Sequence, residues 1–141
     1  MKKQFITIKE LEELELSDQA LFIIDANVSH DYLMKPAEVK QSDLDYWRKD
    51  RKYLCKTNLY KFEMIKKLNA IRLMQLVTDY INHCFSDFDY NTETKVYCLS
   101  LWHDDDCKVY DADGEELIDV LYDLFKQTNK YLTLHFNDDV K

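Results

Sequence analysis

The sequence predicts a single α+β domain with about four helices and a small mixed sheet. The chain has 141 residues, of which 46% are hydrophobic, enough for one core of ordinary domain size. No linker, repeat or low-complexity tract divides residues 1–141 into two units. Segments with the 3.6-residue period of a helix alternate with short segments rich in β-branched and aromatic residues, which is the pattern of a mixed helix and strand fold.

The first half of the chain begins with a helix signal. Thr7 and Glu10 have the spacing of a capping box, in which each side chain satisfies a backbone N–H of the other residue. Residues 20–24 are continuously apolar, and residues 20–25 predict a buried strand. Residues 28–41 contain Pro36 and no steady period, so we expect a loop there, followed by a helix over about residues 42–52.

Residues 58–85 contain no helix breaker, and we expect one long helix. From residue 73 onward the apolar side chains fall on one arc and the polar side chains on the opposite arc. The first half has no such separation. Two explanations stay open: a kink near residues 69–72, or burial of two faces of the helix.

Residues 94–111 predict a β-hairpin, with strands over 94–102 and 107–111 and a loop over 103–106. Asp113 and Glu116 form a second capping-box pattern, which predicts a helix to about Thr128 with an apolar stripe from Leu117 to Phe125. Residues 131–136 predict a C-terminal strand. The last strand, helix and strand then form a parallel crossover, which makes the expected sheet mixed.

Composition excludes several function classes. Gly114 is the single glycine, so the glycine-rich phosphate loops, dinucleotide turns and nucleophile elbows are all absent. The four cysteines show no C-x-x-C pair, and no apolar run approaches the roughly 18 residues of a membrane span. The N-terminus lacks the pattern of a signal peptide. We therefore expect a cytoplasmic protein with no cofactor and no bound metal.

Charge is unevenly distributed along the chain. Residues 1–47 carry 5 basic and 10 acidic side chains, residues 48–72 carry 9 and 2, and residues 73–141 carry 5 and 15. The formal net charge is −8. The chain is thus bipolar, with one basic segment between two acidic ones, and each kind of segment suggests a different binding partner.

The acidic side chains concentrate in what we call the acidic segment, residues 104–123. On the predicted helix, three of them recur at every fourth residue, a spacing at which like charges repel. One interpretation is a solvated face that only keeps the protein soluble. The functional interpretation is a surface that binds a basic partner by imitating a nucleic-acid backbone. Its residues are Asp104, Asp105, Asp106, Asp111, Asp113, Glu115, Glu116, Asp119 and Asp123.

The basic segment supports an alternative. Its cationic side chains are interleaved with Tyr46, Trp47 and Tyr53, a combination that can bind single-stranded nucleic acid or a nucleotide. The same residues could instead pair with acidic regions of this chain, or of a second copy in a homodimer. A net charge of −8 argues against a dedicated nucleic-acid-binding domain. The alternative polyanion-binding residues within residues 48–67 are Arg48, Lys49, Arg51, Lys52 and Lys56.

A third hypothesis is a metal-dependent hydrolase around His103 and residues 104–106. The spacing of Cys98, His103 and Cys107 matches no standard zinc pattern, and no catalytic motif occurs elsewhere, so catalysis is the minority interpretation. In composition (small, acidic, aromatic-rich, glycine-poor) the chain is similar to small anti-defence inhibitors encoded by phages and mobile elements, and to bacterial immunity proteins. The leading hypothesis is a non-enzymatic inhibitor of a basic, nucleic-acid-handling protein.

Overall fold

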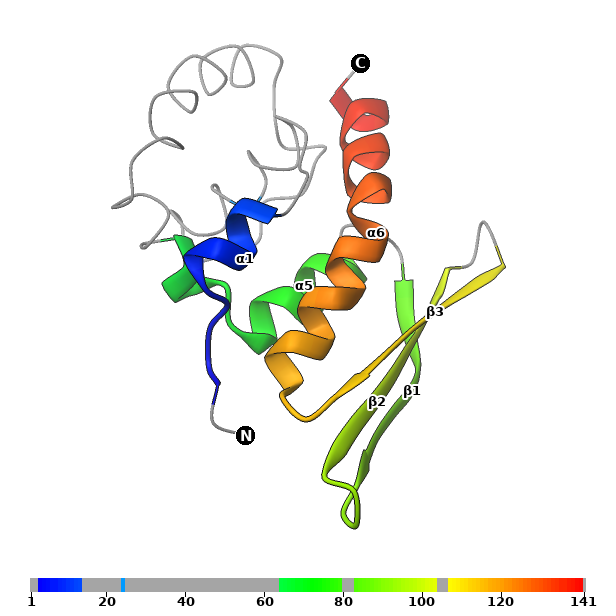
Figure 1. The fold of residues 1–141 in the computed structure, drawn as a ribbon. Coiled ribbons are helices and arrows are strands. Elements are labelled where there is room, and N and C mark those ends of the chain that lie inside the picture. Colours follow the sequence, from blue (N-terminus) through cyan, green and yellow to red (C-terminus); the bar gives the residue numbers. More distant parts are fainter. Residues whose placement is uncertain (1–2, 14–23, 25–63, 80–82, 104–106, 141) are drawn as a thin grey trace.

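The computed structural model describes residues 3–13, 24, 64–79, 83–103 and 107–140. The described elements are α1 (Ile8–Glu13), α5 (Ala70–Asp79), β1 (His83–Asn91), β2 (Val96–His103), β3 (Lys108–Gly114) and α6 (Leu117–Val140). Helices α5 and α6 contact each other and lie against one face of the sheet, α5 on β1 and α6 on β2 and β3 (Figure 1). The α+β class predicted from sequence is confirmed.

The N-terminal capping box is confirmed. The backbone N–H of Glu10 donates to Thr7 Oγ1 over 3.1 Å, and the backbone N–H of Thr7 donates to Glu10 Oε1 over 2.9 Å. Leu11 of α1 is buried, as the predicted apolar face requires. The strand predicted over 20–25 is wrong at its one described residue, because Ile24 is helical and fully buried. The predicted loop at 28–41 and helix at 42–52 lie outside the described residues.

The long helix predicted over residues 58–85 is wrong. Helical residues 64–67 are followed by a break at Leu68 and Asn69, after which α5 begins. Asn69 caps the new helix: its Oδ1 accepts from the backbone N–H of Arg72 over 3.0 Å. The kink considered near residues 69–72 is therefore a full break. The C-terminal end, from His83 to Phe85, belongs to strand β1 instead.

The sheet is antiparallel, in the order β1-β2-β3, so the expected mixed sheet is wrong. The hairpin predicted over residues 94–111 is confirmed as β2 and β3, although β3 continues to Gly114. A second hairpin, not predicted, joins β1 to β2. Asn91 organises its turn by accepting backbone N–H bonds from Glu93 and Thr94 through Oδ1, and Lys95 adopts a positive φ of 58°.

Two predictions around α6 are wrong. Asp113 lies in β3, and the first carbonyl of the helix to accept is that of Glu116, so these two residues form no capping box. The C-terminal strand predicted over 131–136 is helical, because α6 continues unbroken to Val140. No Gly or Pro follows Gly114, and Thr128 bonds the Leu124 carbonyl inside the helix, so nothing stops α6 where the strand was expected.

The core lies between the helices and the sheet. The apolar stripe predicted on the last helix is confirmed: Ile118, Leu121 and Phe125 are at most 1% exposed. They form one cluster with Leu73 and Leu76 of α5 and with buried residues of β2. Among the helices of the described part, none has the length and apolar character that a membrane span requires.

Candidate functional site

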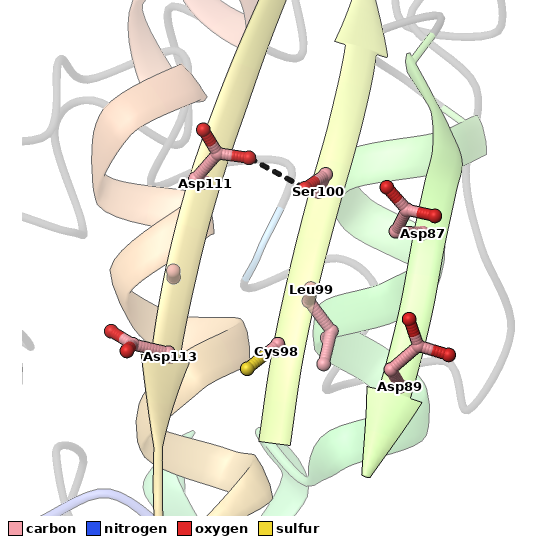
Figure 2. Close-up of a pocket in the computed structure, with 8 residues that line it drawn as sticks. Asp87, Asp89, Cys98, Leu99, Ser100, Asp111 and Asp113 are labelled. Atoms are coloured by element: carbon pink, nitrogen blue, oxygen red, sulfur yellow. Dashed lines mark hydrogen bonds between the residues drawn. The ribbon is translucent and has the colours of Figure 1, made fainter. Parts of the chain in front are cut away.

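The face of the sheet that points away from α5 and α6 is the candidate site, and we call it the outer face. Side chains of β2 alternate between the two faces: Leu99 and Leu101 are buried against the helices, while Cys98 and Ser100 point outward. In the close-up of Figure 2, the helices lie behind the sheet and the outward side chains face the viewer.

Four aspartates define the outer face, and we call them the aspartate quartet: Asp87, Asp89, Asp111 and Asp113. The register places Ser100 between Asp87 of β1 and Asp111 of β3, and Cys98 between Asp89 and Asp113. The carboxylates therefore form two rows, one on each edge strand, separated by the central strand (Figure 2). Together with strand β2 they surround a shallow, open hollow of about 460 Å³.

A β-bulge puts half of this quartet on the outer face. Phe85 pairs with Leu101 and Asp87 with Ser100, so one extra residue, Ser86, is inserted into β1 at this point. Without the insertion, Asp87 and Asp89 would share the inward side of Phe85, because side chains two apart in a strand point to the same face. The bulge therefore moves two carboxylates from the core side to the solvent side.

All charged side chains that the register assigns to the outer face, among the described residues, are acidic. All four quartet aspartates are exposed, so water solvates their charges. Successive aspartates along one strand lie about 6.7 Å apart, and the two rows lie two strand spacings, or about 9.6 Å, apart, so repulsion is strongest within each row. Among the described residues that the register assigns to this face, none is Lys or Arg. Ser100 stabilises the carboxylate of Asp111, because its Oγ donates a hydrogen bond to Asp111 Oδ1 over 2.5 Å.

The acidic segment predicted from sequence separates into groups with different surroundings. Asp111 and Asp113 belong to the outer face, and Glu115 is exposed in the connection to α6. Asp123 on α6 accepts from Gln127 Nε2 over 3.3 Å, and the same nitrogen donates to the Asp111 carbonyl over 3.0 Å. Asp104, Asp105 and Asp106 lie outside the described residues. Asp87 and Asp89 were missed by the sequence analysis.

Two further acidic side chains hold the N-terminal segment against α6. Lys3 Nζ lies 2.6 Å from both Glu10 Oε1 and Asp119 Oδ1, and the Lys3 backbone N–H donates to Glu116 Oε2 over 3.1 Å. Burial by itself lowers the pKa of Lys3, but the hydrogen bonds and charges of Asp119 and Glu10 outweigh it and raise the pKa above its ordinary value. Asp119 and Glu116 thus have a structural role.

The described residues provide no support for the alternative metal site or for the alternative polyanion-binding site. His103 is only 5% exposed at the end of β2, and Cys107 is exposed with a positive φ of 53°. In the described part of the chain no group of three or more His, Cys, Asp and Glu side chains is arranged to hold a metal ion. The alternative polyanion-binding residues, Arg48 to Lys56, lie outside the described residues.

Comparisons with known proteins add no functional information. No family model matches the chain, and neither a curated protein nor a solved structure matches it.

Proposed function

We propose that this chain binds a basic surface of a partner protein through the outer face of its sheet. The aspartate quartet carries the proposal: four exposed carboxylates lie on one face of the sheet, and none of the described residues that the register assigns to this face is Lys or Arg. Holding four like charges together is unfavourable in the free protein, whereas lysine and arginine side chains of a partner would turn the same charges into attraction. The bland alternative is a face that only confers solubility.

The partner that fits this surface best is a protein that itself binds nucleic acid. Such a protein has a positively charged groove that follows the phosphate backbone. Two rows of carboxylates at fixed spacing could occupy that groove and displace the nucleic acid. The chain would then act as a cytoplasmic inhibitor by occupancy, without catalysis, and its binding would weaken steeply as salt concentration rises.

The proposal is tested by capture from a lysate of the source organism after nuclease treatment, using two variants with equal net charge. The face variant carries Asp→Asn at all four quartet positions. The control variant neutralises four other exposed carboxylates: Glu13→Gln, Glu93→Gln, Glu115→Gln and Asp123→Asn. Each captured partner is then purified, and its binding to nucleic acid is measured with and without this chain.

We expect the wild type and the control variant to retain one basic protein after nuclease treatment, and the face variant to lose it. Adding the wild-type chain should release nucleic acid from that protein, with an effect that falls as salt rises from 50 to 200 mM. If the control variant loses the partner and the face variant keeps it, the interface lies on the helix side of the acidic segment. Capture of nucleic acid alone would contradict the proposal and favour the basic segment.

A further inference from the structure

Strands β1 and β3 are both edge strands, but they differ in what packs against them. The strand order places both at the margins of the sheet, but α6 packs along β3, and its Gln127 bonds the backbone carbonyl of Asp111. Within the described part of the chain, the ladder partner of β1 is β2 alone. An edge strand presents a row of backbone N–H and C=O groups that can pair with an added strand.

The side chains of β1 show which strand would fit. On the outer side lie Asp87 and Asp89. On the inner side lie Phe88 and Tyr90. The ring of Phe88 packs edge-on against that of Phe85, with 5.4 Å between the ring centroids, and the ring centroids of Tyr90 and Tyr97 are 4.6 Å apart. Phe88 remains 46% exposed and Tyr90 47% exposed, so the aromatic side of the strand is only half covered. Charge and apolar surface therefore alternate along the same edge.

We propose that β1 accepts an extended segment of the basic partner as a fourth strand. Lysine or arginine side chains at alternate positions of that segment would face Asp87 and Asp89, and the apolar side chains between them would cover Phe88 and Tyr90. This inference rests on the proposed function, because the same carboxylates recognise the partner. Main-chain pairing would provide affinity and the alternating side chains specificity, as in other cases of strand addition to a sheet edge.

A second copy of this chain is a poorer occupant of the edge. Pairing β1 with β1 of another copy would bring the two sets of Asp87 and Asp89 onto one face at neighbouring positions. Like charges at such positions are destabilising, and acidic edge residues and bulges are common devices against edge-to-edge association. The bulge at Ser86 limits regular pairing with any added strand, whether from a second copy or from a partner, to residues 87–91, a length of about 16 Å.

The probe for the test is the synthetic octapeptide Lys-Val-Lys-Thr-Lys-Val-Lys-Thr. Two control peptides have the same charge: one groups the four lysines at one end, and the other carries N-methyl groups on the Val and Thr nitrogens, which removes alternate backbone donors. Amide hydrogen exchange of the full chain, followed by NMR, reports which backbone groups become protected. Peptide affinity is measured in parallel at 50 mM salt.

Edge docking predicts slower exchange at alternate amides of residues 87–91 when the alternating peptide binds. N-methylation and the grouped sequence should each weaken binding about tenfold, because backbone pairing or the match of alternating side chains is lost. A double variant, Phe88→Ala with Tyr90→Ala, should weaken binding of the alternating peptide. The matched control Ile71→Ala, which alters another exposed apolar residue on α5, should not.

The outcomes separate this inference from the proposed function. If all three peptides bind equally, without protection of β1 amides but with loss in the face variant, the acidic face binds cations and edge docking is wrong. If no peptide binds, edge docking is wrong, and the capture experiment decides the proposed function separately. If binding survives in the face variant, the acidic face is not the recognition surface, and both proposals fail.

Discussion

At the scale of single residues, Lys3 joins the N-terminal segment to the last helix. Its ammonium group contacts carboxylates on α1 and α6, both at 2.6 Å. Lys3→Met keeps most of the aliphatic side chain and removes both ion pairs. Because the site is partly exposed and solvent screens such pairs, we expect a loss of about 1 kcal/mol in the free energy of unfolding at pH 7, measured with urea. Lys9→Met, at an exposed position on α1, should change it by less than about 0.5 kcal/mol.

The contribution of Lys3 should depend on pH on both sides of neutrality. Burial by itself raises the pKa of Glu10, but hydrogen bonds from Lys3 and Thr7 outweigh it and hold the pKa below the ordinary 4.5. A carboxyl with a lowered folded-state pKa stabilises the fold above its unfolded value, and this stabilisation is lost as pH falls through the folded value. The raised pKa of Lys3 gives the mirror image, with stability lost as pH rises through a value above 10.5.

The deficit of Lys3→Met should therefore be constant between about pH 6 and 9 and should shrink at both lower and higher pH. Urea unfolding of both proteins across the pH range measures it. A deficit that stays the same at pH 3 would mean that the lysine stabilises the fold through packing of its side chain, not through charge.

Tyr122 makes the second contact between α6 and the N-terminal segment. It is 2% exposed, and its hydroxyl donates to the backbone carbonyl of Glu10 over 2.6 Å. Burial and the charges of Glu10 and Glu13 raise its pKa far above 10. Tyr122→Phe should cost about 1 kcal/mol, because a carbonyl loses its donor while the ring packing is kept. Thermal unfolding compares it with Tyr97→Phe, which should cost less.

At the scale of elements, Asn69 decides where α5 begins. Asn69→Ala removes the acceptor for the Arg72 N–H and should destabilise the protein by about 1 kcal/mol. Asn69→Asp keeps an acceptor at the same place and adds a negative charge at a helix N-terminus, so it should be neutral or slightly stabilising. Circular dichroism during urea unfolding distinguishes the two. Equal loss in both variants would contradict a capping role.

Local signals explain which elements could be predicted from the sequence. The capping box at Thr7 and the stripe from Leu117 to Phe125 depend on residues a few positions apart, and both were predicted correctly. Residues 83–85 continue a helical pattern without a breaker, yet they form a strand because β2 lies beside them. Residues 131–136 have β-favouring side chains, yet α6 continues through them. Strand propensity depends on a pairing partner, which local sequence does not show.

For the same reason, the sequence analysis named only two of the four aspartates of the quartet. Asp111 and Asp113 belong to the predicted hairpin strand or the residues next to it, and their alternation is visible in the sequence. Asp87 and Asp89 reach the same face only through pairing with β2 and the bulge at Ser86. A bulge has no distinctive residue signature here, because neither Gly nor Asn occupies it. The complete quartet therefore exists only in three dimensions.

At the scale of the whole molecule, acidic side chains are concentrated in one part of the sequence and on one face of the sheet. Residues 73–141 carry 15 acidic and 5 basic side chains, and the sheet within that segment carries four carboxylates on one face. A protein that needed only solubility could spread the same charge and avoid repulsion between close neighbours. Such a concentration is what the proposed function requires, because the opposite charges would belong to the partner.

The clustering of like charges on the outer face should lower the stability of the free protein. The face variant and the four-residue control variant both change the net charge from −8 to −4, because each loses four negative charges. If clustering is what costs stability, the face variant should be more stable than wild type by about 0.5–1 kcal/mol at low salt, even though Asp111→Asn alters the bond from Ser100. The control variant should gain less.

Urea unfolding at 20 and 500 mM salt measures the stability of both variants. The advantage of the face variant should disappear at the higher concentration, where the Debye length falls to about 4 Å. Equal gains in the two variants would mean that only net charge matters, and the outer face would then have no special electrostatic role.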